Sequence, residues 1–480
     1  MTKQKALAVS QKQNFKQMKL LLLTLLLIFT NLSFIFGQGI VINEIMSSNE
    51  TTITDEDGDY PDWIELYNSS GISVNLSGYT ISDEISNLDK WTFPEIELLP
   101  DSFLLVFASG KDRAEGPFLH TNFKIEQSGE NLFLSNLVGG ISSIDSVSVP
   151  TDNSYGCISD GNPMFCLFNS PTPKLSNAGS NGIYCSYPSG FYPEGFNLSL
   201  TQANENYSIY YTLDGKTPTS NSYLYSSPLS ISNNSSSPNN ISLIPTTPLE
   251  GPSVLEYFIW KEPENVYKAN VIRFASFDGD IRKSAVYTKT FFVDPNMENR
   301  YTFPIISLVT DSLNLFEYDT GIYIPGKTFD ENGWNGWPSG NYHHKGIYWE
   351  RDIHISYFEN DGAIGFETNA GMRMRGYGSA SMPQKSFNVY FRGEYGLKKI
   401  DYPIFNNGIT TYKRLVFRNS GNDFLASHFK DAMLQDLLKP FDLELQGFKP
   451  SVVFFNGEYW GIHNIREKYD KYYFKYKFGI

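Results

Sequence analysis

Hydrophobic and polar residues alternate in short runs along most of the chain, and this pattern predicts strands. Between residues 38 and 178 the clearest runs are 40–45, 63–67 and 103–107, which are rich in β-branched and aromatic residues and end at turn residues. No amphipathic helix pattern interrupts them. The sequence therefore predicts a β-sandwich over 38–178, ending in a linker rich in Ser and Pro.

Two further units are expected after the linker. In residues 182–294 an alternating strand at 207–212 leads into Asp214-Gly215, a tight-turn signal, so we expect a second and smaller sandwich. Residues 300–480 mix strands with one helix, predicted over 424–439. The expected fold is multi-domain and β-rich, with two sandwiches followed by an α+β unit.

The predicted helix carries an apolar stripe, and a hairpin follows it. Leu425, Phe429, Ala432 and Met433 share one face at 100° per residue, so we expect that face to be buried. Asp436 falls inside this stripe, so it should have a cationic partner or lie at the edge of the stripe. Pro440 ends the helix. Beyond it, Asn456-Gly457 stands between two apolar runs and predicts a tight hairpin turn.

The N-terminus has the features of an export signal. Three lysines at positions 12, 16 and 19 precede an apolar run over 20–29, which is shorter than the roughly 20 residues that span a bilayer. We therefore predict a signal peptide over 1–37, cleaved before Gln38, and a secreted or cell-surface protein. A membrane anchor is the alternative.

The net charge argues against one class of partner, and the cysteine content bears on whether the chain forms a disulfide. The chain has 38 Lys and Arg against 52 Asp and Glu, a formal net charge of −14. Such a chain repels phosphate backbones, so nucleic acid is not an expected partner. An exported chain with three cysteines allows one disulfide, and the loop between Cys157 and Cys166 is the easiest to close.

An acidic turn near the N-terminus is a candidate calcium site. Asp55, Asp57 and Asp59 stand at alternate positions around Gly58, with Asp62 close behind, so a tight loop could turn several oxygens onto one Ca²⁺. The twelfth position of the loop is a leucine and not a bidentate Glu, which excludes an EF-hand. A solvated acidic turn is the alternative.

Two segments resemble accessory modules of exported proteins. Residues 42–45 (Ile-Asn-Glu-Ile) and 62–68 (Asp-Trp-Ile-Glu-Leu-Tyr-Asn) resemble the lamin-tail domain, which implies an immunoglobulin-like sandwich used for attachment or binding. Residues 211–215 (Tyr-Thr-Leu-Asp-Gly) and 217–219 (Thr-Pro-Thr) resemble the small sandwich appended to chitobiases and β-hexosaminidases. Such modules carry no glycosidase acid/base pair, so the resemblance does not imply glycan hydrolysis.

A series of motifs runs through residues 300–480, namely 373–376 (Arg-Met-Arg-Gly), 384–386 (Gln-Lys-Ser), 454–461 (Phe-Phe-Asn-Gly-Glu-Tyr-Trp-Gly) and 465–468 (Ile-Arg-Glu-Lys). With these motifs the segment resembles the CotH kinase family of secreted, spore-coat type, atypical kinase-like proteins. The resemblance implies transfer of the ATP γ-phosphoryl group, with Mg²⁺ or Mn²⁺, to extracellular or surface proteins. The α+β unit is then an incomplete kinase-like domain.

The same resemblance implies a set of nucleotide-binding residues. Charge, open backbone amides and a hydroxyl make a phosphate cradle of Arg375, Gly376, Gly378 and Ser379. Lys385 would contact the α- and β-phosphates, and its acidic partner would be Asp431 or Asp436. Glu467, beside Arg466, would lie near the lobe connection where nucleotide bases dock, or form a structural ion pair there.

The catalytic and metal-binding aspartates of this family lie beyond the hairpin, and only thirteen residues follow Glu467. We therefore predict no catalytic residue within the chain and no turnover by this fragment alone. Two alternatives stay open, a non-catalytic adhesion or matrix scaffold and a carbohydrate-binding accessory protein. Binding to cell-surface glycans is suggested by rings that could stack on sugars beside His343-His344, namely Trp334, Trp337, Tyr342 and Trp349.

Overall fold

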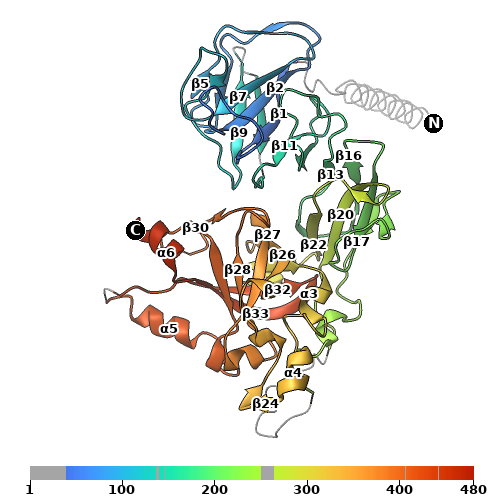
Figure 1. The fold of residues 1–480 in the computed structure, drawn as a ribbon, viewed down its shortest axis with the longest axis vertical. Coiled ribbons are helices and arrows are strands. Elements are labelled where there is room, and N and C mark those ends of the chain that lie inside the picture. Colours follow the sequence, from blue (N-terminus) through green and yellow to red (C-terminus); the bar gives the residue numbers. More distant parts are fainter. Residues whose placement is uncertain (1–38, 137–139, 146, 250–263, 406, 442) are drawn as a thin grey trace, which may run out of the picture.

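The computed structural model describes residues 39–136, 140–145, 147–249, 264–405, 407–441 and 443–480. The predicted signal peptide lies outside these residues. Figure 1 shows a first β-sandwich at the top, a second β-sheet unit at the right and a barrel at the bottom. The predicted β-rich, multi-domain architecture is confirmed.

The first unit is built from two facing sheets. The larger sheet has the strand order β12-β11-β1-β2-β7-β8 and the smaller one β10-β9-β4-β5. The strands of the larger sheet are β1 (Ile40–Met46), β2 (Asp62–Asn68), β7 (Phe103–Ala108), β8 (Leu119–His120), β11 (Ser154–Cys157) and β12 (Phe165–Phe168). Those of the smaller sheet are β4 (Thr80–Ser82), β5 (Trp91–Thr92), β9 (Asn131–Ser135) and β10 (Ile141–Asp145), and β3 (Val74–Asn75) pairs with β6 (Glu97–Leu98).

Both faces of the larger sheet are covered, so even polar residues of its strands, such as Glu44 and Glu65, are fully buried. Ile42, Ile64 and Val106 belong to the core between the sheets. On the other face of the sheet, Trp63 and Phe107 belong to a second hydrophobic cluster, which neighbouring loops cover. Because strand side chains alternate between faces, one apolar run serves two cores.

The second unit is a β-sheet structure that packs around its own small core. Its main sheet has the order β14-β22-β20-β17-β18, with β21 paired to β20. The strands are β14 (Gly190–Tyr192), β17 (Ser208–Thr212), β18 (Tyr223–Leu224), β20 (Asn270–Asp278), β21 (Ile281–Arg282) and β22 (Tyr287–Val293). Two short pairs, β13 (Ile183–Cys185) with β16 (Leu200–Gln202) and β15 (Phe196–Leu198) with β19 (Leu229–Ile231), complete it. The helix α2 (Met297–Arg300) leads into the barrel, and η1 (Ile241–Leu243) packs Ile241 against the barrel core.

The third unit is a closed barrel of seven strands. Its order is β23-β26-β27-β28-β31-β33-β32, and the parallel pairing of β23 with β32 closes it. The strands are β23 (Ile305–Val309), β26 (Arg351–Phe358), β27 (Ile364–Arg375), β28 (Ser386–Tyr390), β31 (Arg414–Arg418), β32 (Phe448–Phe455) and β33 (Glu458–Glu467). Two short hairpins, β24 (Trp334–Asn335) with β25 (Trp337–Pro338) and β29 (Ile400–Asp401) with β30 (Thr411–Tyr412), lie beside it.

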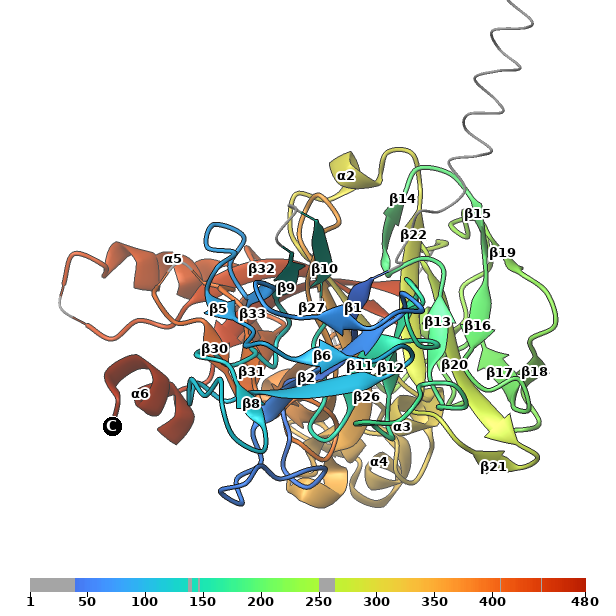
Figure 2. The same cartoon turned by 90° about the horizontal axis from the view of Figure 1, so that it is seen from above.

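Short helices surround the barrel. The helical segments are α3 (Ser312–Phe316), α4 (Gly326–Asn332), η3 (Asn341–His343), η4 (Ile347–Trp349), η5 (Gly378–Ser381), η6 (Gly421–Asp423), α5 (Lys430–Leu437) and α6 (Lys471–Phe478). Figures 1 and 2 both show α5 and α6 on the side of the barrel away from the second unit. Within the described residues, no helix is both long and apolar enough to cross a membrane.

The second unit and the barrel share a hydrophobic core, so they are joined by more than a linker. Phe292 of β22 packs there with Phe358 of β26 and Phe454 of β32. The Gly215 turn also approaches Asn456 so closely that a Cβ atom on Gly215 would lie 2.5 Å from the asparagine side chain. Only glycine fits this approach, which accounts for the Asp-Gly pair in the sequence.

The predicted helix is shorter than expected and its stripe is exposed. Residues 424–427 form turns, and α5 covers only Lys430–Leu437. The exposed fraction is 65% for Leu425 and 50% for Phe429, and of the helix residues only Ala432 is buried. The prediction of a buried apolar face is therefore wrong for the described residues. Amphipathic spacing predicts which residues share one side of a helix, but it does not show whether another part of the protein packs against that side.

The three cysteines are free thiols. Cys157 lies opposite Phe165 on the neighbouring strand, whereas Cys166 lies opposite Gly156. Successive strand residues point to opposite faces, so the two sulfur atoms cannot meet across this pair of strands. The expected Cys157–Cys166 disulfide is wrong.

Candidate functional site

The outer face of the barrel sheet carries a row of arginines. Strand pairing places Arg375 of β27 beside Ser386 of β28, and Val416 of β31 beside Arg466 of β33. Arg418 lies two residues beyond Val416, so alternation puts Arg418 on the same face. Basic side chains from β27, β31 and β33 thus gather on one surface, with β28 between the first two strands, in a chain whose formal net charge is −14.

Asp431, at the start of α5, binds two of these arginines. Its Oδ2 atom lies 2.7 Å from Arg418 Nη1 and 2.9 Å from Arg466 Nη2. The Arg466 side chain is only 1% exposed, and burial lowers its pKa while Asp431 works in the opposite direction. One carboxylate therefore bridges two guanidinium groups, leaves the cluster with a net positive charge, and fixes the N-terminus of α5 to the sheet.

Arg375 is the member of this group with the most open side chain. It is exposed, and Nη1 donates a hydrogen bond of 3.4 Å to Asn388 Oδ1. Partial burial and the neighbouring Arg418 guanidinium lower the pKa of Arg375 below its usual value. Among the described residues no carboxylate forms an ion pair with Arg375. We call Arg375, Arg418, Asp431 and Arg466 the arginine cluster.

Two of the predicted acidic residues lie elsewhere. Asp436 is 66% exposed and pairs with Lys439 on the same helix, so its expected place in a buried stripe is wrong. Glu467 is buried and accepts hydrogen bonds from Gly447 N (2.7 Å) and Asn407 Nδ2 (2.8 Å). It follows Arg466 on one strand, so the two side chains point to opposite faces and form no pair with each other.

Lys385 is enclosed by the protein. Its Nζ donates hydrogen bonds to the carbonyl oxygens of Ala380 (3.0 Å) and Met382 (2.9 Å), and it lies 3.8 Å from the centre of the Tyr342 ring. Burial lowers the pKa of Lys385 well below its usual value. No carboxylate of the described part of the chain contacts this amine. A phosphate contact would require the loop to move, and the assigned role of Lys385 stays a prediction.

The predicted phosphate loop is held by two lysines. Lys345 Nζ contacts the carbonyl oxygen of Gly376 at 3.2 Å, and Lys385 Nζ contacts the carbonyl oxygen of Ala380 further along the loop. Gly376 has φ = 111°, and the Ser379 carbonyl accepts a hydrogen bond from Asn419 Nδ2. Gly378 packs on Trp337, where an added Cβ would meet the indole at 3.2 Å. The loop thus turns carbonyl oxygens toward ammonium groups, and its use as a cradle stays a prediction.

The acidic turn converges on a lysine. Lys111 Nζ lies 2.5 Å from Asp55 Oδ2, 2.7 Å from Asp57 Oδ2 and 2.8 Å from Asp59 Oδ2. The carboxylates raise the pKa of Lys111 although burial opposes this effect. Three of the four predicted ligands therefore lie together. Asp62 does not join them, because it lies in β2, where burial raises the pKa of its carboxyl to about 7.

Calcium can bind this turn only by displacing Lys111, since the ammonium group occupies the point where the three carboxylates meet. We expect Lys111→Ala to raise the affinity for Ca²⁺ by about tenfold or more, because one competing positive charge is removed. Isothermal titration of both proteins measures this difference. Lys90→Ala, which removes the partner of Asp83 and Glu84 instead, is the matched control. Equal Ca²⁺ affinity in wild type and Lys111→Ala would contradict calcium binding at the turn.

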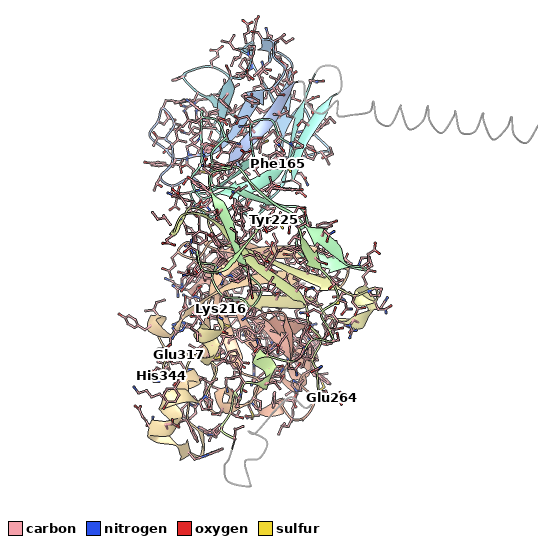
Figure 3. The ribbon with its side chains drawn as sticks, turned by 90° about the vertical axis from the view of Figure 1, so that its right-hand side faces the viewer. Phe165, Lys216, Tyr225, Glu264, Glu317 and His344 are labelled. Atoms are coloured by element: carbon pink, nitrogen blue, oxygen red, sulfur yellow. The ribbon has the colours of Figure 1, made fainter. Side chains whose placement is uncertain are left out.

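The aromatic residues considered for glycan stacking do not form one open surface. Tyr342 is fully buried, Trp337 is 38% exposed, and His344 stacks on Trp349 with ring centres 4.1 Å apart. Figure 3 shows His344 in the half of the molecule away from Phe165 of the first sandwich. Glycan binding stays a proposal to be tested.

The fold and site define a multi-domain β protein in which two sheet units precede a barrel with a basic outer face. Comparison with protein families identifies three parts of the chain. Residues 372–479 match the model described as CotH kinase protein, 37–151 match the Lamin Tail Domain, and 187–248 match the Chitobiase/beta-hexosaminidase C-terminal domain. No curated protein matches the chain.

These matches confirm the three resemblances seen in the sequence. The CotH match suggests the CotH family and with it the use of nucleotide and metal, and the other two matches suggest accessory binding modules. All four residues of the arginine cluster lie within the CotH match.

Arg418 and Lys345 were not anticipated by the motif reading, although the sequence contains a usable signal for Arg418. In Arg414-Leu415-Val416-Phe417-Arg418 the two arginines share one side of an alternating strand, opposite Leu415 and Phe417. By the same alternation, Lys385 lies on the side of the core residue Phe387, two positions along, and not on the outer face with Ser386. The contact of Lys345 with the loop depends on distant chain packing and has no local signal.

Proposed function

We propose that the chain is an exported protein whose CotH-type domain binds ATP with Mg²⁺ or Mn²⁺ at the arginine cluster. The observation that carries the proposal is the exposed Arg375 beside Arg418, on one sheet face of an acidic protein. Guanidinium groups bind phosphate oxygens in a fixed, often bidentate geometry. The two sheet units would serve attachment or binding, and the acceptors would be extracellular or surface proteins.

The residues of the cluster suit a nucleotide with its metal. Bound ATP would supply the γ-phosphoryl group for transfer. Arg375 and Arg418 would hold phosphate oxygens, and the buried Arg466 would support the charge of the site from beneath. Asp431 is the one carboxylate of the cluster, and it would either remain on the arginines or serve the divalent cation.

Nucleotide binding is expected to depend on Arg418. Replacing it by glutamine removes one charge-assisted contact to phosphate, which is worth about 1.5–3 kcal/mol, so ATP–Mg²⁺ affinity should fall by roughly tenfold or more. Isothermal titration measures this change. Arg282→Gln, an exposed arginine of β21 in the second unit, should leave the affinity unaltered. Wild-type affinity in Arg418→Gln would reject the site.

Lys385→Met separates this site from the predicted phosphate loop. The Lys385 amine is enclosed and does not reach the outer face, so the variant should retain ATP affinity. A loss of binding in Lys385→Met, with Arg418→Gln unaffected, would instead favour the loop as the nucleotide site.

The enclosure of Lys385 also favours a second candidate, a non-catalytic surface scaffold of the same family. In the described structure this lysine has no carboxylate partner, unlike the charge pairs that position a phosphate-binding lysine in kinases. Transfer of labelled phosphate from ATP to protein would support the enzyme. Nucleotide binding without any transfer would support the scaffold.

A further inference from the structure

A cavity of about 330 Å³ opens beside the barrel, at the opposite end of the outer face from Arg375. The side chains that matter here are Tyr390 of β28, Arg392 and Lys398 of the following segment, Lys413 and Arg414 at the start of β31, and Tyr472 of α6. The lining contains one carboxylate, Glu394. Carboxylates outside the lining pair with Arg392, Lys398 and Arg414, so among the described residues Lys413 is the lining cation without a carboxylate partner.

The ion pairs around the cavity leave positive charge available. Arg414 is paired with Asp470 at 2.8 Å, and Arg392 with Glu350 at 2.9 Å. Lys413 has no carboxylate partner among the described residues, and its amine lies 5.3 Å from the centre of the Tyr472 ring. Its charge therefore faces the cavity without a counter-ion from the protein.

The cations are held in place by aromatic rings. The Tyr390 ring lies 5.2 Å from the Arg392 guanidinium, 5.5 Å from that of Arg414 and 5.1 Å from Lys468 Nζ. Cation–π contacts restrict long basic side chains before a ligand arrives, so less conformational entropy is lost when an anion binds. The lining thus combines one cation that has no counter-ion, Lys413, with neighbouring basic side chains that are already held in position.

We propose that this cavity binds a phosphate-type anion and that it is separate from the arginine cluster. Tyr390 pairs with Arg414, four residues along their strands from Ser386 and Arg418. At about 3.3 Å per residue, the two rows lie roughly 13 Å apart on one face, so different side chains hold an anion at each. The proposal does not depend on ATP binding at Arg418.

The rim of the cavity already attracts a carboxylate from another domain. Lys398 forms an ion pair with Glu50 of the first sandwich. A carboxylate from outside the barrel therefore binds at the rim of the cavity. A phosphate group, which carries more negative charge, could bind the basic side chains of the cavity in the same way. Both a nucleotide and a phosphorylated protein residue carry such a group, and the experiment separates these sources.

The test is lysine acetylation followed by mass spectrometry on the whole chain. Saturating pyrophosphate should slow acetylation of Lys413 by roughly tenfold, because the bound anion covers its amine. Lys327, a 53% exposed lysine near the other end of the barrel, should react at an unchanged rate. Parallel samples with ATP and with a phosphoserine peptide show which source of phosphate gives the same protection.

Arg418→Gln distinguishes this site from the arginine cluster. Protection of Lys413 by pyrophosphate should persist in this variant, even if ATP binding at the cluster is lost or was never present. Protection that disappears in Arg418→Gln would mean that the anion binds at the cluster, and it would overturn the proposal. No protection of Lys413 in the wild type at millimolar pyrophosphate would overturn it as well.

Discussion

Replacing Glu367 by alanine should lower the free energy of unfolding by roughly 3 kcal/mol, because it leaves the largely buried ammonium group of Lys289 without its counter-charge. Glu367 of β27 lies 2.8 Å from Lys289 Nζ of the second unit and accepts a hydrogen bond of 2.6 Å from Ser189 Oγ. The glutamate side chain is 17% exposed, which places the expected loss at the lower end for buried pairs.

The pKa of Glu367 also gives this pair a pH dependence. Lys289 and His354 hold the pKa of the carboxyl well below its usual value, even though burial opposes them. The stabilisation is therefore present above the unfolded pKa of 4.5 and is lost as the pH falls below it.

Denaturant unfolding of Glu367→Ala measures the expected loss, and Glu298→Ala on the exposed surface of α2 is its control. Because Glu367 joins the second unit to the barrel, the variant should also separate their unfolding transitions. A change in unfolding free energy below about 1 kcal/mol would show that the pair contributes little to the joint.

The first sandwich should become less stable as the pH rises from 5 to 8. Burial raises the pKa of Glu65 to about 8, and the nearby Glu44 carboxylate adds to the shift. Glu65 sits on β2 and accepts a hydrogen bond from the Lys174 backbone, so it ties the linker to the sheet. A carboxyl whose folded pKa is raised stabilises the protein fully below its unfolded pKa, near 4.5, and that stability is lost as the pH rises through 8.

Hydrogen exchange in β1 and β2 at a series of pH values measures this loss, after correction for the intrinsic exchange rate. We expect a decrease in local opening free energy on the order of 2–3 kcal/mol between pH 5 and 8. Glu65→Gln should flatten this dependence, whatever its effect on stability at any single pH. An opening free energy that is constant or rises with pH in the wild type would contradict a protonated Glu65.

Local signals in the sequence were sufficient to predict much of the β structure. The hairpin of β32 and β33 was expected from its turn residues, and Asn456 and Gly457 both adopt positive φ, at 44° and 86°. A two-residue hairpin turn requires positive φ at both central residues, and Asn-Gly is the pair that adopts it most readily. The turn can therefore be predicted from these two residues without knowledge of any distant contact. Helix α5 shows the converse, since its burial depends on a covering surface that spacing alone does not specify.

The candidate site was predicted in part. The family resemblance pointed to Arg375 and Asp431 as site residues, and the structure places both in the arginine cluster. The pairing of Asp431 with Arg418 and Arg466 could not be predicted, because it joins a helix to two strands that are adjacent only in the folded barrel. Lys385 follows the motif but lies on the inner side of its strand, where alternation with Phe387 directs it.

The central claim is that ATP phosphates bind the outer face of the barrel at Arg375 and Arg418. Its most direct test is arginine modification by phenylglyoxal, read by mass spectrometry with and without ATP and Mg²⁺. Binding at the cluster predicts slower modification of Arg375 and Arg418 when nucleotide is present, and an unchanged rate at Arg282. Equal modification of all three arginines at saturating ATP would contradict the claim.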